Sequence, residues 1–206
     1  MQVCEIFYSL QGESGYSGQP CVFVRLTGCN IRCQFCDTTY AYDTGTSMAI
    51  SDVINQVQQF GISLVEITGG EPLLQSETVE LALQLADLKY TVLVETNGTL
   101  PINVLKAPII RIMDIKCPCS NESDKMDWQN LEYLRSGDEI KFVVQDRNDF
   151  DYVQSIIRKY PQLKQYPVHL SPVHHVLPPE QLAAWILESK QPVRLHLQLH
   201  KLLNLK

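Results

Sequence analysis

Three cysteines lie close together near the start of the chain. Cys29, Cys33 and Cys36 are separated by three and then two residues, so one short loop can present all three thiolates. Cysteine thiolates are the usual ligands of iron–sulfur clusters. Three of them would hold three corners of a cubic [4Fe–4S] cluster and leave the fourth iron open. An open iron can bind and reduce a small molecule, so the spacing predicts chemistry rather than electron storage alone.

Zinc is the main alternative ligand for these thiols. A Cys-x2-Cys pair is also half of a common zinc site, and a structural zinc would need a fourth ligand from another cysteine or a histidine. The chain has seven cysteines and five histidines, so such a ligand is available. A zinc-stabilised binding module without catalysis therefore stays open as a second class of function.

A glycine pair forms the second chemical feature. Gly69 and Gly70 lie in the run Thr68-Gly69-Gly70-Glu71-Pro72, directly after an apolar stretch. Two glycines let the backbone approach a ligand closely. A Gly-Gly pair is usually only a turn, but this one comes one strand–helix unit after the cysteine loop. In a parallel sheet the two loops would lie side by side at the carboxyl ends of the strands.

Alternating strands and helices must position these loops. Near-continuous apolar runs are typical of parallel strands buried on both faces. We expect strands at residues 21–27, 62–68, 90–95, 109–115, 139–144, 166–170 and 193–199. Helical periodicity predicts helices at residues 51–60, 77–88 and 180–189, and after Asp146, which can cap the helix that follows it.

This alternation predicts an α/β fold with right-handed crossovers. A full eight-fold barrel usually needs about 250 residues, whereas about six units fit here. We therefore expect a small, modified partial barrel of the (βα)6 type, formed by a single domain over residues 1–206. Residues 1–18 precede the first barrel strand as an N-terminal extension. Loops 28–42, 69–72, 96–99, 116–120 and 171–177 should share one rim.

Composition and charge limit the classes of partner and the cellular compartment that the sequence predicts. Apolar residues make up 45% of the chain, charged residues 19%, and the net charge is −6. This balance argues against unspecific binding to nucleic acid or acidic membranes. No apolar run approaches the roughly 20 residues of a membrane span, and the first residues do not form a signal peptide. An odd number of cysteines indicates free thiols in a reducing compartment, so we expect a cytoplasmic protein.

The two loops together resemble the radical S-adenosylmethionine (SAM) superfamily. The cysteine spacing matches that superfamily's cluster motif, and Gly69-Gly70-Glu71 matches its methionine-binding turn. The resemblance implies a [4Fe–4S] cluster and SAM as cofactors. An electron from the reduced cluster would cleave SAM to methionine and a 5′-deoxyadenosyl radical, which takes a hydrogen atom from the substrate.

Further segments are similar to one family within that superfamily, the 7-carboxy-7-deazaguanine synthases. They are residues 5–14, Phe23-Val24-Arg25-Leu26, Cys36-Asp37-Thr38, Glu95-Thr96-Asn97-Gly98 and Asp114-Ile115-Lys116-Cys117-Pro118. The resemblance covers nearly the whole chain. It implies a lyase that converts 6-carboxy-5,6,7,8-tetrahydropterin to 7-carboxy-7-deazaguanine with loss of ammonia, the ring contraction that supplies queuosine and other 7-deazapurines. The rival within the superfamily is an activase that installs a glycyl radical in a partner enzyme.

The resemblance also assigns roles to individual residues. Cys29, Cys33 and Cys36 would bind the cluster, Thr38 would bind Mg²⁺, and no side chain would be catalytic, because SAM carries the radical. The substrate would contact Leu10, Gln11, Gly12, Arg25, Thr68 and Lys206, with the guanidinium of Arg25 suited to a carboxylate. SAM would contact Phe35, Asp37, Gly70, Lys116, Cys117, Pro118, Cys119, Ser171, Pro172 and Val173.

The resemblance implies two partners. An external flavodoxin or ferredoxin would deliver the electron, and the family is usually homodimeric. His174-His175, on a rim loop, is interpreted as surface or ligand-edge packing rather than a metal site.

Overall fold

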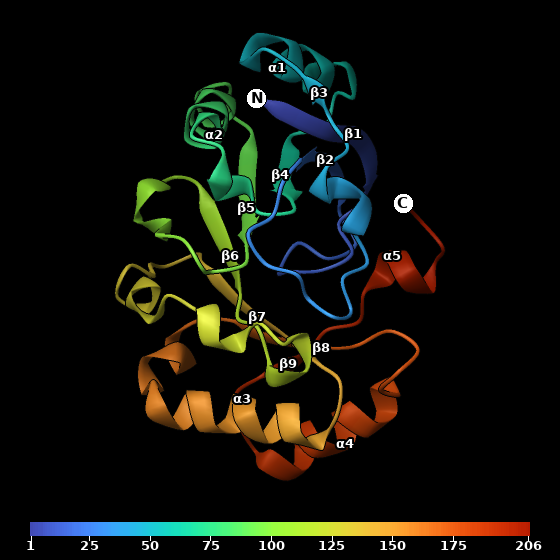
Figure 1. The fold of residues 1–206 in the computed structure, drawn as a ribbon, viewed down its shortest axis with the longest axis vertical. Helices are drawn as coiled ribbons and strands as arrows, with labels where there is room; N and C mark the ends of the chain where they lie inside the picture. Colours follow the sequence, from blue (N-terminus) through green and yellow to red (C-terminus); the bar gives the residue numbers. More distant parts are fainter.

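The computed structural model describes all residues, 1–206, and is organised around one nine-stranded sheet (Figure 1). The strand order is β3-β1-β2-β4-β5-β6-β7-β8-β9. The strands are β1 (Gln2–Leu10), β2 (Pro20–Leu26), β3 (Thr46–Ser47), β4 (Leu64–Gly69), β5 (Thr91–Thr96), β6 (Ile110–Asp114), β7 (Glu139–Val144), β8 (Val168–Pro172) and β9 (Arg194–Leu195).

The strands from β2 onward, apart from the short edge strand β3, pair in parallel, and β3 and β9 are the two edges of an open sheet. The predicted α/β partial barrel is therefore confirmed, and it does not close. Because parallel neighbours point the same way, the carboxyl ends of these strands meet along one rim.

The N-terminal extension forms part of this sheet. β1 runs antiparallel to β2, from Val3 opposite Leu26 to Leu10 opposite Pro20, and β3 pairs with its outer side. β3 covers β1 only at Gln2 and Val3, so most of its outer side has no partner strand and part of β1 is exposed. Because β1 is antiparallel, its last residue, Leu10, lies beside Pro20 at the amino end of β2, and the Gln11 side chain that follows donates to Glu66 on β4.

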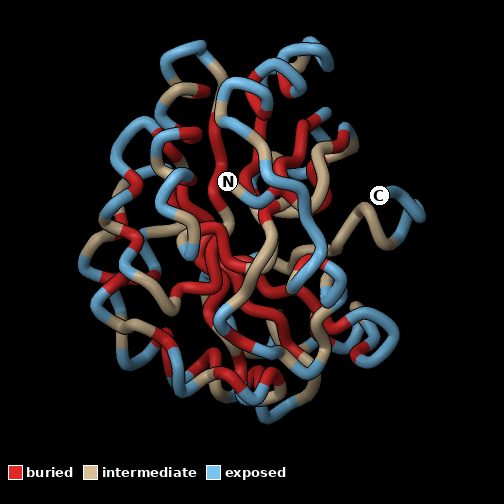
Figure 2. Tube along the Cα trace, turned by 45° about the horizontal axis from the view of Figure 1, so that its top comes forward, coloured by how far each residue is buried: buried red, intermediate tan, exposed pale blue.

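Four α-helices cover the sheet: α1 (Ile50–Gln59), α2 (Glu77–Asp87), α3 (Arg147–Lys159) and α4 (Pro179–Ser189). They confirm the predicted helices to within about a residue at each end, and the Asp146 side chain accepts the Asp149 N–H at 3.0 Å as the cap of α3. One apolar cluster packs α1 and α2 on the sheet and a second packs α3 and α4. Figure 2 shows this buried core running along the strands.

Two crossovers contain no α-helix. Only short 3-10 turns connect β5 to β6 and β6 to β7. The buried Arg111 links these two connections. It binds Asp138 through Nε at 3.0 Å and donates to the backbone oxygens of Ile102 (3.3 Å) and Tyr133 (2.5 Å). One side chain therefore holds both irregular connections against the sheet.

The expected strand at residues 193–199 is wrong for most of its length. Only Arg194 and Leu195 pair with β8, and α5 (Leu199–Leu202) follows. The polar side chains after β9 form hydrogen bonds with the N-terminal loop instead. His196 Nε2 lies 3.0 Å from the Ser14 oxygen, and Gln198 Nε2 lies 2.7 Å from Glu13 Oε1. The chain therefore leaves the sheet and crosses toward the rim (Figure 1).

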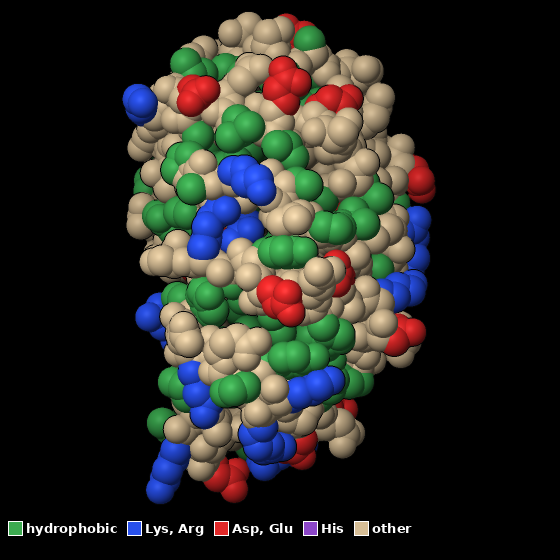
Figure 3. Space-filling view, turned by 90° about the vertical axis from the view of Figure 1, so that its left-hand side faces the viewer, with side chains coloured by type: hydrophobic (Ala, Val, Ile, Leu, Met, Phe, Trp, Pro, Cys, Tyr) green, Lys and Arg blue, Asp and Glu red, His purple; other side chains and the backbone are tan.

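The molecular surface mixes both signs of charge. Basic and acidic side chains are interspersed with apolar ones on the face drawn in Figure 3. None of the helices is long and apolar enough to cross a lipid bilayer.

Candidate active site

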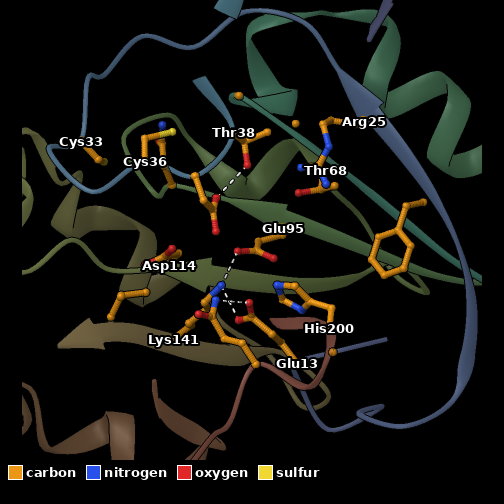
Figure 4. A pocket seen from close by; sticks show the side chains of 18 of the residues that line it. Glu13, Arg25, Cys33, Cys36, Thr38, Thr68, Glu95, Asp114, Lys141 and His200 are labelled. Atoms are coloured by element: carbon orange, nitrogen blue, oxygen red, sulfur yellow. Dashed lines mark hydrogen bonds and ion pairs between the residues drawn. The ribbon is translucent and has the colours of Figure 1, made fainter. Parts of the chain in front are cut away.

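A cavity of about 700 Å³ opens at the carboxyl ends of the parallel strands. Side chains from successive strands point into it, including Arg25 from β2, Thr68 from β4, Glu95 from β5, Asp114 from β6 and Lys141 from β7 (Figure 4). Its volume lies within the range of about 300–1,000 Å³ usual for small-molecule sites.

Most residues singled out in the sequence lie around this cavity. The lining includes all three motif cysteines, Thr38, every predicted substrate residue (Leu10, Gln11, Gly12, Arg25, Thr68, Lys206) and the predicted SAM residues Phe35, Asp37, Gly70, Lys116 and Val173. The structure does not bring Cys117, Pro118, Cys119, Ser171 and Pro172 to the cavity wall. Cys117 packs instead in the core beneath α3.

The cysteine loop is held by the segment that follows β6. The Arg32 N–H donates to Glu122 Oε1 at 2.7 Å, and the Gln34 N–H donates to the Ser120 oxygen at 3.2 Å. Burial raises the pKa of the Cys29 thiol, and raises that of Cys33 to about 11. Iron binding requires thiolates, so loading the loop must release protons.

The motif cysteines and their neighbours do not form a four-ligand site for zinc. The structure contains no group of three or more Cys, His, Asp or Glu side chains close enough to hold a single metal ion. A structural zinc needs four ligands at about 2.0–2.3 Å. The three cysteines line one cavity, as expected for a cluster held by three thiolates with one corner open.

The Gly-Gly turn is packed directly on the cysteine loop. A Cβ on Gly70 would lie 2.1 Å from the Gly28 oxygen, and Gly69 has φ +148°. The Glu71 carboxylate behind the turn is fully buried. It accepts hydrogen bonds from the Leu73 N–H (3.0 Å), the Thr96 hydroxyl (2.8 Å) and the Asn97 N–H (2.6 Å). The turn therefore presents its backbone to the cavity on a rigid support.

Oxygen ligands suited to Mg²⁺ lie beside the third cysteine. The Thr38 hydroxyl donates to Asp37 Oδ1 at 2.8 Å, and Lys201 Nζ lies 2.6 Å from Asp37 Oδ2. Hydroxyl and carboxylate oxygens are the donors that this hard cation prefers. The Thr38 hydroxyl therefore offers an oxygen of the kind that the predicted metal takes, while the Asp37 carboxylate is paired with the Lys201 ammonium.

Arg25 is presented by the pair of strands at one side of the cavity. Its Nε donates to Glu5 Oε1 at 2.9 Å, while the same carboxylate accepts from the Tyr40 hydroxyl at 2.9 Å and pairs with Lys206 at 2.5 Å. The guanidinium also lies 5.7 Å from the centre of the Phe7 ring. Glu5 thus orients Arg25, and the far edge of its guanidinium faces the cavity.

Five charged residues that sequence reasoning left without a role also line the cavity: Glu13, Glu66, Glu95, Asp114 and Lys141. The Lys141 ammonium binds Glu13 and lies 2.9 Å from Glu95 Oε1. A charged residue inside an otherwise apolar strand, such as Glu66 in β4 or Lys141 in β7, was the available signal, because such residues are seldom buried without a partner.

These groups do not share one protonation behaviour. Burial alone would raise the pKa of Glu13, but the Lys141 ammonium lowers it to about 2. Burial and the neighbouring charge of Glu95 raise the pKa of Glu66 to about 8. Gln11 Nε2 donates to Glu66 Oε2 at 2.5 Å. Near neutral pH the wall therefore holds a carboxylate, a carboxylic acid and an ammonium in fixed positions.

The C-terminal segment covers one side of the cavity. The Leu199 N–H donates to the Gly12 oxygen at 3.0 Å, and Gln198 Nε2 donates to Glu13 Oε1 at 2.7 Å. A Cβ on Gly12 would lie 2.1 Å from His200 Nδ1, so only glycine lets the two segments pack this closely. The expected strand here is replaced by a cover that lines the site with His200, Lys201 and Lys206.

Comparison with known proteins gives one consistent result. The Radical SAM superfamily pattern matches residues 23–113. The 7-carboxy-7-deazaguanine synthase of Koribacter versatilis is 42% identical over 98% of this chain and 96% of its own length. That of Chlorobaculum tepidum is 41% identical over 98% and 93%. The crystal structure of QueE from Escherichia coli, at 22% identity, covers 96% of this chain and 93% of its own with a TM-score of 0.79, which shows the shared fold.

Proposed function

We propose, because the chain belongs to the 7-carboxy-7-deazaguanine synthase family of radical SAM enzymes, that it converts 6-carboxy-5,6,7,8-tetrahydropterin to 7-carboxy-7-deazaguanine with release of ammonia. It is a carbon–nitrogen lyase of 7-deazapurine biosynthesis, the route to queuosine. Its cofactors are a [4Fe–4S] cluster, SAM and Mg²⁺.

One observation supports this function above the others. The cysteine loop, the Gly-Gly turn and the Leu10-Gln11-Gly12 segment, which are far apart in sequence, line a single cavity of small-molecule size. An activase for a glycyl-radical enzyme must admit a protein segment instead. Here the C-terminal segment already occupies one side of the opening.

The protein's own residues bind and orient the reactants. Cys29, Cys33 and Cys36 are proposed as the cluster ligands, and the backbone of Gly69-Gly70 as the support for the methionine end of SAM. When bound, the cluster and SAM supply a radical that removes a hydrogen atom from the substrate. The surrounding wall and the C-terminal segment would limit the access of water to that radical.

Substrate recognition is proposed to divide between two sides of the cavity. Arg25 and a Mg²⁺ held by Thr38 would orient the substrate carboxylate, a templating role. The amino and amide N–H groups of the pterin ring need acceptors, and the carboxyl groups of Glu66 and Glu95 on the opposite side can provide them. Gln11 fixes the orientation of Glu66 through its 2.5 Å hydrogen bond.

The partners and setting are part of the same proposal. A flavodoxin or ferredoxin would deliver the electron, and two copies of the chain would form a homodimer. All seven cysteines are free thiols. This is consistent with a reducing, cytoplasmic compartment, where disulfides are rare.

The test is an anaerobic assay with reconstituted protein, a strong reductant, SAM, Mg²⁺ and carboxytetrahydropterin. We expect a deazaguanine absorbance together with methionine and 5′-deoxyadenosine. Cys33→Ala should lose iron and activity. Cys119→Ser, whose thiol does not line the cavity, is the matched control and should retain both. Full iron content and activity in Cys33→Ala would exclude the ligand assignment, and SAM cleavage without deazaguanine would exclude the substrate.

A further inference from the structure

We propose that Asn97 positions and tunes the iron–sulfur cluster, by donating a side-chain N–H to the sulfur of the ligand Cys29. This inference rests on the proposed function only in requiring that the cluster is bound. Asn97 follows β5 directly and is 5% exposed. Its Nδ2 lies 3.9 Å from Cys29 Sγ and 3.0 Å from Asn30 Oδ1.

The orientation of the Asn97 amide is fixed by its other partner. Asparagine oxygen and nitrogen atoms must be assigned from their hydrogen bonds. The Thr99 backbone N–H, which can only donate, lies 3.0 Å from Asn97 Oδ1. The oxygen must therefore face Thr99, and the nitrogen must face the cysteine loop. Its two hydrogens match the two acceptors there, Asn30 Oδ1 and Cys29 Sγ.

A closed ring of hydrogen bonds keeps this arrangement. Asn30 Nδ2 donates to the Thr99 hydroxyl at 2.7 Å, and that hydroxyl donates to Asn97 Oδ1 at 2.7 Å. Asn97 Nδ2 completes the ring at Asn30 Oδ1. Each side chain has one partner on either side, so rotating the amide of Asn97 would break several bonds at once.

The same residue is tied to the methionine-binding turn. The Asn97 N–H donates to Glu71 Oε2 at 2.6 Å, and the preceding Thr96 hydroxyl donates to the other oxygen of Glu71 at 2.8 Å. Asn97 therefore connects the backbone that supports SAM with the first cluster ligand. A shift of one would be transmitted to the other through a single residue.

The chemical consequence follows from the charge on the sulfur. Hydrogen bonds to cluster sulfurs are one of the determinants of the reduction potential, and partners of a metal's ligands tune the metal. Reduction adds negative charge that spreads over the sulfurs, so a donor favours the reduced form. Loss of the Asn97 donor should make the cluster harder to reduce.

The experiment compares Asn97→Ala and Asn97→Asp with wild type in the cluster-loaded protein. Iron and sulfide per chain, and the midpoint potential from a redox titration followed by electron paramagnetic resonance, are measured without pterin. We expect the equilibrium constant for reduction to fall about tenfold in Asn97→Ala, which is about 59 mV for one electron. In Asn97→Asp the equilibrium constant for reduction should fall further, because the carboxylate adds a negative charge and cannot donate a hydrogen bond. Asn148→Asp adds the same charge at an exposed position of α3 that does not line the cavity, and it should leave the potential unchanged.

A purely structural role for Asn97 predicts a different result. It would lower the unfolding midpoint of Asn97→Ala but leave the potential and the resonance spectrum of the loaded fraction as in wild type, and this would overturn the proposal. If Asn97→Ala does not fold, Asn97→Asp decides, because its carboxylate can still accept the Thr99 N–H; an unchanged or higher potential there refutes the tuning role. Since no pterin is present, failure of the proposed ring contraction would leave these readouts unaffected, whereas a wild-type protein that binds no iron would refute the function itself.

Discussion

Gly70→Ala tests how closely the methionine-binding turn must approach the cysteine loop. The added Cβ would lie 2.1 Å from the Gly28 oxygen, 2.6 Å from the Gly28 carbonyl carbon and 2.8 Å from Cys29 Cβ. Ordinary contact begins at 3.4 Å, so the two segments must separate by 1.3 Å, the difference between 3.4 and 2.1 Å. Two of the three neighbours are backbone atoms, so no side-chain rotation can relieve the contact.

This separation should lower both the stability of the fold and the rate of SAM cleavage. Overpacking costs about 1–3 kcal/mol, but misplacing reactants by about 1 Å can cost a factor of about 100 in rate. We therefore expect SAM cleavage to fall about 100-fold in Gly70→Ala, measured as 5′-deoxyadenosine formed in a single turnover per bound cluster. Urea unfolding should show the loss of stability, about 1–3 kcal/mol.

The matched control is Gly61→Ala. Gly61 has φ +66° and no atom within 4 Å of a Cβ position, so alanine there meets only backbone strain. That strain is roughly 1–2 kcal/mol, similar to the cost expected at Gly70, and the cleavage rate should stay at the wild-type value. If Gly70→Ala and Gly61→Ala cleave SAM equally fast, close contact between turn and loop does not position the cofactor.

Three further changes probe the buried charges. Lys141→Met leaves the partly buried carboxylates of Glu13 and Glu95 without their cation and should destabilise the fold by about 3–5 kcal/mol in urea unfolding; a loss below about 1 kcal/mol would show that water reaches this wall. The raised pKa of Glu66, about 8 against 4.5 unfolded, gives a stabilisation that is complete below pH about 4.5 and is lost as pH rises through 8. Each pKa unit corresponds to about 1.4 kcal/mol, so Glu66→Gln should be the more stable protein at pH 8, and an unchanged pH profile would contradict the assignment. Asp138→Ala strands the buried guanidinium of Arg111 and should cost about 3–5 kcal/mol, whereas a thermal midpoint equal to wild type would show that the pair is dispensable.

The parts of the fold that local sequence specifies were predictable. The parallel strands and four helices follow from apolar runs and helical periodicity, and both motif loops fall where a strand ends. β1 was not predicted as a strand, because Gln2, Glu5 and Ser9 interrupt its apolar run. An antiparallel strand needs only one buried face, so these polar residues are tolerated. The pattern of residues 193–199 suggests a strand, but the partners of that segment lie at the other end of the chain.

The candidate site also has a part that local sequence specifies and a part that depends on contacts between distant segments. Cys29, Cys33, Cys36 and the Gly-Gly turn are short local patterns, and the cavity contains all of them. The pairing of Lys141 with Glu13 joins residues on β7 and on the loop after β1, and no local pattern specifies such a pair. Cys117 and Cys119 were expected near SAM because of the resemblance to the family. The chain turns inward at Pro118, however, and buries Cys117 in the core.

The guanidinium of Arg111 links the two connections on either side of β6. It donates hydrogen bonds to the backbone oxygens of Ile102 and Tyr133 and to Asp138, so the two helix-free connections depend on the same side chain. Contiguous cooperative units open together in native proteins. Amide protons across residues 98–138 should therefore exchange with deuterium as one group, earlier than those beneath α1 and α2. Local unfolding should then begin in the middle of the sheet rather than at its edges.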